Sequence, residues 1–136
     1  MNSQRASVGL LDTSAVIASE EGRPLNEEAL PAETVISIVT VAELRAGVLG
    51  APDIEIRDRR LATLERASNA AVFPIDRRVA ETWAGMRAYL AASGGRVSVN
   101  DLWIAATAAA NRMPVVTQDR DFYALSGVNG LTVIEV

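Results

Sequence analysis

Short apolar runs alternate with longer segments of helical periodicity along the whole chain. Apolar runs typical of buried strands lie at 8–12, 34–38, 70–75, 114–117 and 131–136. Segments that favour helices lie at 13–20, 39–50, 54–68, 76–95 and 98–113, and a turn with a helical piece is expected at 118–127. Because strands that alternate with helices form βαβ units, the pattern predicts an α/β fold with a mainly parallel central sheet flanked by helices.

The last long helix has an unusual composition. In the segment SVNDLWIAATAAANRM, from Ser98 to Met113, no residue between Leu102 and Ala110 is charged, which predicts a helix buried on nearly every side. Its first turn nevertheless carries an acid, Asp101. The spacing from Ser98 matches a capping box, in which a hydroxyl and an acid three residues later bind free backbone N–H groups.

Four more acids follow predicted strands or lie near the start of the next helix: Asp12, Glu43, Asp119 and Asp121. The carboxyl ends of parallel strands meet at one edge of a sheet, and ligand sites form at that edge in folds of this type. We therefore expect these acids and Asp101 to gather there.

Each acid taken alone also has a structural explanation. Asp12 is placed to cap a helix that begins at Thr13, and Asp119 is placed to form a turn. The stretch TVAE repeats the capping-box spacing, with Thr40 as N-cap and Glu43 three residues later. Capping alone would distribute acids between both ends of the domain, so their common placement favours a shared site.

A group of carboxylates at a partly buried edge needs a positive charge nearby, because the acids otherwise repel one another and take up protons. A divalent cation meets this need. Ligands that are all oxygen atoms select a hard ion, so the sequence predicts magnesium or manganese rather than zinc, copper or calcium. Such ions support the hydrolysis of phosphodiester bonds.

The composition removes most other chemistry. The chain has no lysine, histidine or cysteine, so all 13 of its basic residues are arginine. Histidine bases, cysteine nucleophiles, Schiff-base lysines, zinc fingers and Walker-type phosphate loops are excluded by residue type. The net charge of -4 argues against general electrostatic binding of nucleic acid, so any contact with phosphate is expected to be local.

Length and hydropathy bound the organisation of the chain. Its 136 residues, of which 49% are hydrophobic, predict one compact domain over 1–136. The mean hydropathy of +0.17 is high for so small a domain and predicts apolar surface that a partner covers. The polar start MNSQRAS precedes an apolar run too short for a signal peptide or a membrane span, which predicts a cytoplasmic protein without a membrane partner.

Four stretches together resemble the successive motifs of PIN-domain nucleases. They are LLDTSAVI with Asp12, SIVTVAELRAGV with Glu43, NDLWIAATA with Asp101 and VVTQDRDF with Asp119. Their order and spacing resemble those of the VapC toxins of bacterial toxin-antitoxin systems. The resemblance covers nearly the whole chain, from Val8 to Val136.

The resemblance implies a PIN-like three-layer sandwich that carries a catalytic metal site. Asp12, Glu43 and Asp101 match the family's metal-binding acids. Asp119 matches a fourth, less strict position, for which Asp121 is an alternative. Three hydroxyl residues match positions that orient a carboxylate or a metal-bound water in such sites: Thr13, Ser14 and Thr117.

The resemblance also implies a biological role. A magnesium- or manganese-dependent endoribonuclease of this family cuts structured RNA, such as tRNA or ribosomal RNA, and thereby inhibits translation. The implied protein partners are a second copy in a homodimer and a small cognate antitoxin that covers the active-site groove. The surplus of apolar residues is consistent with both interfaces.

Other classes of protein match the sequence less well. A receiver domain shares the parallel fold and an acidic pocket, but it needs a lysine, which this chain lacks. A haloacid-dehalogenase-type phosphatase has a second aspartate where Ser14 stands. A non-catalytic α/β interaction module, and a PIN-domain nuclease of RNA processing, stay open as alternatives.

Arginines are the candidates for local contacts with RNA. They occupy helical positions 57, 59, 60, 66, 77 and 78, although charged helix positions are more often simply solvated. Arg45 is the stronger candidate because it lies only two residues beyond Glu43.

Overall fold

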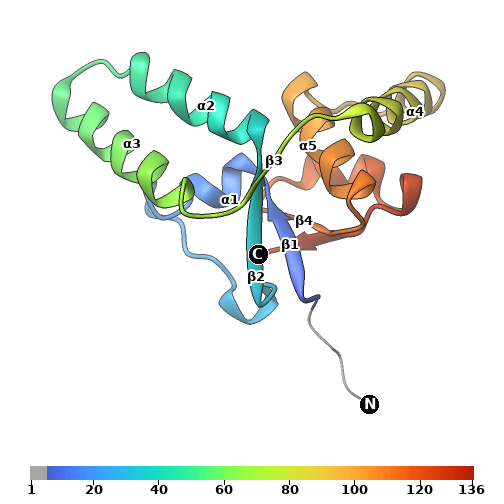
Figure 1. Cartoon of the computed structure of the whole chain (residues 1–136), viewed down its shortest axis with the longest axis horizontal. Coiled ribbons are helices and arrows are strands. Elements are labelled where there is room, and N and C mark those ends of the chain that lie inside the picture. The colour runs from blue at the N-terminus through green and yellow to red at the C-terminus, as the bar shows by residue number, and fades with distance from the viewer. Residues whose placement is uncertain (1–5) are drawn as a thin grey trace.

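The computed structural model describes residues 6–136 (Figure 1). Within this range the parallel strands are β1 (Val8–Leu11), β2 (Glu33–Ser37), β3 (Val72–Phe73), β4 (Val115–Thr117) and β5 (Val133–Glu135), in the sheet order β3-β2-β1-β4-β5. The α-helices are α1 (Thr13–Ile17), α2 (Ile38–Leu49), α3 (Ile54–Ala67), α4 (Arg77–Ser93) and α5 (Val99–Ala110). Short 3-10 helices are η1 (Glu27–Ala29), η2 (Arg120–Leu125) and η3 (Val128–Gly130).

Strand β1 lies at the centre of the sheet, and its register with both neighbours fixes where the chain leaves it. Leu11 at its end pairs with Ile36 of β2 and with Val116 of β4. The chain therefore passes from β1 into α1 at Asp12, at the edge where β2 and β4 also end. This is the carboxyl edge of the sheet, as the parallel pattern predicted.

The helices form two groups on the two sides of the sheet, as Figure 1 shows. Helices α4 and α5 pack together and against the sheet around a large apolar core, whose fully buried members include Leu10, Met86, Ile104 and Phe122. Helices α1, α2 and α3 form the second group around a smaller core of Leu44, Val48 and Leu64. The predicted parallel sheet flanked by helices is confirmed.

Helix α5 is the apolar helix that the sequence predicted. Leu102 and every residue from 104 to 108 are buried in it. Five alanines in this helix favour helical structure and let neighbouring backbones approach closely. Despite this apolar character, no helix within residues 6–136 has the length and hydropathy needed to cross a membrane.

The predicted strand over 70–75 is much shorter than expected. Only Val72 and Phe73 pair with β2. The next residue, Pro74, has no backbone N–H to donate to the ladder, so the strand ends before it. The other predicted elements are present, with their ends shifted by a few residues.

The predicted cap of α2 was wrong. The N-cap is Ser37, whose Oγ accepts a hydrogen bond from the backbone N–H of Val39 at 3.0 Å. Thr40 lies inside the first turn and is fully buried. The reason is that α2 follows β2 without a loop, so the last residue of the strand also serves as the helix cap.

Gly9 of β1 gives a test of this packing. A Cβ atom at this position would lie 2.6 Å from Cγ of Pro31 and 2.8 Å from Cγ2 of Val116, two side chains with little freedom to move. We expect Gly9→Ala to lower the free energy of unfolding by about 1–3 kcal/mol, the usual cost of overpacking. Urea denaturation followed by circular dichroism measures this change in the free energy of unfolding.

Gly85 of α4 provides the control. A Cβ atom there would meet only the Asn129 side chain, at 3.7 Å. Gly85→Ala is expected to raise the stability by up to about 1 kcal/mol through helix propensity. A Gly9→Ala protein as stable as the wild type would contradict the close approach of Pro31 to β1.

Candidate active site

Asp12 is the most buried acid of the carboxyl edge, with 2% of its surface exposed. It caps α1, because its Oδ1 accepts a hydrogen bond from the backbone N–H of Ala15 at 3.2 Å. The hydroxyl of Ser14 donates to the same carboxylate, at 2.8 and 3.0 Å from its two oxygens. Burial raises the pKa of Asp12, and these hydrogen bonds partly oppose the rise. Asp12 is thus both the predicted helix cap and a member of the acidic edge.

Glu43 on α2 is tied to the start of α1. The Thr13 hydroxyl donates to Oε1 of Glu43 at 2.7 Å and lies 3.0 Å from the hydroxyl of Thr40. Glu43 and Gly47 line a pocket of about 260 Å³ together with Thr13. Small residues next to Glu43 therefore leave a groove beside its side chain. Thr40 contributes by binding Thr13 rather than by capping the helix.

Asp101 lies in the first turn of α5, where its backbone N–H donates to Oγ of Ser98 at 3.2 Å. The predicted N-cap is confirmed. The pKa of Asp101 is raised from 3.8 to about 6, mainly by burial, while the Ser98 hydrogen bond opposes this rise. Three nearby negative charges contribute to the rise: those of Asp12, Asp119 and Glu43. The other three acids that match the family motifs therefore lie within electrostatic range of Asp101.

Asp119 and Asp121 occupy different surroundings. The backbone N–H of Asp119 donates to the Thr117 hydroxyl at 2.8 Å, and its Oδ1 accepts from the backbone N–H of Asp121 at 2.9 Å. Asp121 itself is exposed, lines a separate pocket beside α4, and is not among the charges that raise the pKa of Asp101. These surroundings favour Asp119 as the fourth member of the cluster.

The donor set suits a hard divalent ion, because every candidate ligand is a carboxylate or hydroxyl oxygen. Among residues 6–136 no three acids stand close enough to form a ready-made set of metal ligands. The carboxylates of Asp12, Glu43 and Asp119 act on Asp101 through their charges. A magnesium-like ion keeps several waters and uses few carboxylates, so it does not require three acids in contact.

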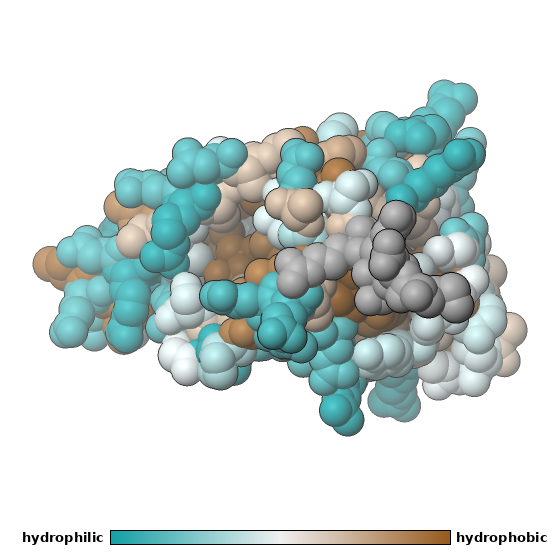
Figure 2. Space-filling model, turned by 90° about the horizontal axis from the view of Figure 1, so that it is seen from below, coloured by the Kyte–Doolittle hydropathy of each residue, from teal (hydrophilic) through white to brown (hydrophobic). Residues whose placement is uncertain are grey.

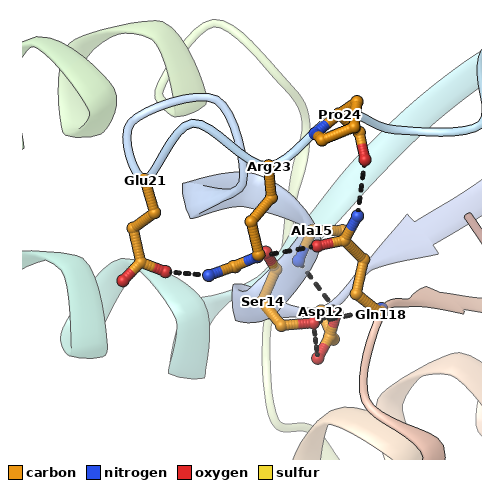
Figure 3. Close-up of polar contacts among 7 residues, drawn as sticks. All are labelled: Asp12, Ser14, Ala15, Glu21, Arg23, Pro24 and Gln118. Atoms are coloured by element: carbon orange, nitrogen blue, oxygen red, sulfur yellow. Dashed lines mark hydrogen bonds and ion pairs between the residues drawn. The ribbon is translucent and has the colours of Figure 1, made fainter.

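A hydrogen-bond network behind Asp12 was not predicted from the sequence (Figure 3). Arg23 reaches the site from the loop after α1. Its Nη2 donates to the backbone carbonyl of Ser14 at 3.0 Å, and its Nε donates to Oε1 of Gln118 at 2.9 Å. Arg23 also pairs with Glu21. These contacts hold the loop after α1 against Ser14, the residue whose hydroxyl donates to Asp12.

Gln118 is the centre of this network. Its backbone N–H donates to Oγ of Ser14 at 3.2 Å. Its side-chain Nε2 donates to the backbone carbonyls of Pro24 at 2.9 Å and Val136 at 3.3 Å. The sequence offered one signal for this residue, since Gln118 stands directly between Thr117 and Asp119.

A family model for the PIN domain matches residues 9–128. The chain belongs to the PIN-domain family. This PIN domain is 50% identical to Ribonuclease VapC5 of Mycobacterium tuberculosis over 128 residues, which cover 94% of this chain and 95% of that protein. It is 41% identical to Ribonuclease VapC4 of the same organism over 133 residues, covering 98% and 100% of the two chains.

A solved structure resembles the whole PIN domain. It is that of VapBC-5, a member of the VapBC family of toxin-antitoxin systems from Mycobacterium tuberculosis, with a TM-score of 0.90 and 47% identity. The match covers 96% of this chain and 99% of that one. The predicted PIN-like sandwich and the resemblance to VapC toxins are both confirmed.

Arg45 does not share the pocket of Glu43 in this PIN domain, and its contact with RNA stays a prediction. Residues two positions apart on a helix point to different faces, so Arg45 is exposed and does not line the pocket that holds Glu43. Arg60 lines that pocket instead, and its Nη1 donates to the carbonyl of Gly47 at 2.8 Å. Arg78, another candidate, binds Asn111 and Asp76.

The raised pKa of Asp101 predicts how the stability of the metal-free PIN domain depends on pH. Its folded pKa of about 6 lies above the ordinary 3.8, so the folded state binds this proton more tightly than the unfolded chain does. The stabilisation is therefore complete below pH 3.8 and is lost as the pH rises through about 6. The raised pKa of Asp12 acts in the same direction. We expect a shallower loss in Asp101→Asn, measured as melting temperature against pH in EDTA.

Asp121→Asn is the matched control, because it removes an exposed carboxylate outside the coupled set. Its melting curves should follow the pH dependence of the wild type. Identical pH dependence in Asp101→Asn and the wild type would mean that Asp101 titrates normally in the folded protein.

Proposed function

We propose that this PIN domain, acting as one unit over 1–136, is a metal-dependent endoribonuclease and the toxin of a toxin-antitoxin pair. The observation that carries the proposal is the gathering of four carboxylates at the carboxyl edge of the sheet. They belong to Asp12, Glu43, Asp101 and Asp119. Their position in a PIN fold, in a chain 50% identical to a protein named as a ribonuclease, supports nuclease chemistry over a purely structural role for the acids.

The four acids would hold the divalent ion on which nucleases of this family depend, with magnesium or manganese favoured by the all-oxygen donor set. When bound, such an ion polarises the phosphate and makes water a better nucleophile. The hydrolysis adds water across one phosphodiester bond, which leaves a phosphate monoester on one fragment and a hydroxyl on the other.

Hydroxyl groups of this chain keep the acids in place. Ser14 donates to both oxygens of Asp12, and Thr13 donates to Glu43, so each carboxylate is oriented by a neighbour on α1. Oriented carboxylates need no rearrangement when charge develops on the phosphate, which is the condition for electrostatic catalysis. We infer that the first turn of α1 serves as the positioning element of the site.

Exposed apolar side chains support protein partners. Leu49 and Ile54, at the turn between α2 and α3, are 67% and 77% exposed. Figure 2 shows hydrophobic surface at this end of the molecule among hydrophilic groups. A cognate antitoxin and a second copy in a homodimer are the proposed partners. The resemblance to VapBC-5, a member of a family of toxin-antitoxin systems, supports the antitoxin. The proposed substrate is structured RNA such as tRNA or ribosomal RNA, whose cleavage would inhibit translation.

Asp12→Asn tests the nuclease role. The amide keeps the shape of the side chain but removes the charge that helps to hold the ion, so we expect RNA cleavage to fall by at least about a hundredfold. Cleavage is measured on end-labelled tRNA and ribosomal RNA fragments with magnesium or manganese. Induced expression of the wild type should also arrest growth, and expression of Asp12→Asn should not.

Asp58→Asn is the control for this test, since Asp58 is an exposed acid on α3. It should cleave as the wild type does. Melting temperatures show whether Asp12→Asn is folded, and added magnesium should raise that temperature more for the wild type than for the variant. Full cleavage by purified, folded Asp12→Asn would rule out a catalytic role for the acidic edge.

To compare Asp119 with Asp121, each is replaced by alanine and cleavage is measured at limiting manganese. Asp119 belongs to the coupled acids and Asp121 does not, so Asp119→Ala is expected to lose at least about ten times more activity. Asp121→Ala should retain the metal requirement of the wild type. An equal loss in both variants would show that the fourth position is shared.

A further inference from the structure

A second pocket adjoins the acidic edge on the side of α4. It has a volume of about 500 Å³ and lies between the second half of α4, the start of α5 and the beginning of η2. Two of its lining residues, Ser98 and Leu102, lie on either side of Asp101 along the chain. Asp121, two residues beyond Asp119, closes another side. The pocket and the acid cluster therefore share the first turn of α5.

Two arginines of this pocket form no polar side-chain contact within residues 6–136. Arg87 on α4 and Arg96 in the loop before α5 are both exposed. In the part of the chain that the structure describes, neither takes part in an ion pair or a side-chain hydrogen bond. Asp121 is the one acid among the described residues that line the pocket, so the pocket carries two positive charges against one negative charge. In a chain of net charge -4 this is a local positive site.

The rest of the pocket wall is apolar and firmly supported. Trp83 stacks on Trp103 with ring centroids 4.8 Å apart and planes 14° apart, so its ring is held in one orientation. Val99, at the start of α5, is 68% exposed although it is apolar. Such a wall suits the flat face of a base or a ribose.

We propose that this pocket binds an RNA nucleotide next to the phosphodiester that is cleaved. Arg87 and Arg96 pair with its phosphate, and its base or ribose packs against Trp83 and Val99. The carboxylate of Asp121 accepts hydrogen bonds from N–H groups on the base edge. This subsite rests on the proposed ribonuclease function and adds to it a means of placing the strand across the acids.

A nucleotide fits these features better than a simple anion or a peptide. The pocket combines paired guanidinium groups, an apolar wall and one acceptor, and a nucleotide offers a phosphate, a flat ring and N–H donors in one unit. The volume also lies within the range of about 300–1,000 Å³ that is usual for small-molecule sites.

Binding of a fluorescein-labelled single-stranded RNA octamer of mixed sequence tests the proposal. Anisotropy titrations in EDTA, at several salt concentrations, separate binding from cleavage. The double variant Arg87→Ala/Arg96→Ala is expected to raise Kd about tenfold. It should also reduce the slope of log K against log salt by about 0.7, the value for one phosphate on a single strand. In magnesium the same variant should raise KM more than it lowers kcat.

Arg112→Ala is the matched control, because it removes one exposed arginine just beyond the far end of α5, the helix whose start lines the pocket. It should keep Kd within about twofold of the wild type, since its charge lies away from the pocket. Val99→Asp is an independent variant that adds a negative charge to the pocket wall and should weaken binding. An acid in the first turn of a helix favours the helix, so this variant keeps its fold.

The outcomes separate the subsite from the function on which it rests. Equal weakening by Arg112→Ala and by the Arg87→Ala/Arg96→Ala double variant would show general charge attraction and overturn the subsite. Unchanged RNA binding in the double variant, while the wild type still cleaves RNA, would also overturn it and leave the ribonuclease proposal intact. A wild type that neither binds nor cleaves RNA would overturn both.

Discussion

The burial of one carboxylate at the end of the central strand constrains the whole carboxyl edge. Asp12 stands between the ends of β2 and β4 with almost no access to water, so its charge must be stabilised by the protein or by a bound cation. The fold supplies hydrogen bonds from Ser14 and Ala15, but it also places further acids near the site. The repulsion between these acids lowers the stability of the fold. Such a cost is typical of functional sites, where the arrangement needed for catalysis conflicts with stability.

Much of this arrangement follows from the sequence because two periodic signals agree. Alternating strand and helix patterns define the parallel sheet, and that sheet alone brings acids from distant motifs to one edge. The buried helix α5 could likewise be predicted from its uncharged stretch. The network of Arg23 and Gln118 could not be predicted, because these polar residues lie 95 positions apart and belong to no periodic pattern. Thr40 was misjudged because local spacing does not reveal that α2 begins directly at the end of β2.

The two groups of helices give the acidic edge unlike borders. On the side of α2 and α3 the adjoining pocket contains three acids, Glu20, Glu21 and Glu43, against one arginine, Arg60. On the side of α4 the adjoining pocket contains two unpaired arginines. A polyanion that crosses the edge therefore meets attraction on one side and repulsion on the other. Such an asymmetry would orient a strand with respect to the acids and would limit contact on the acidic side to the atoms nearest the cluster.

The stacked tryptophans have a practical consequence for studies of folding. The sequence holds two tryptophans and two tyrosines, and all four lie on α4, α5 or η2: Trp83, Tyr89, Trp103 and Tyr123. Intrinsic fluorescence and near-ultraviolet circular dichroism therefore report on one half of the molecule. Local opening of α2 and α3, whose core is the smaller one, would be silent in these signals. Agreement between them and a backbone probe is needed before unfolding is treated as a single transition.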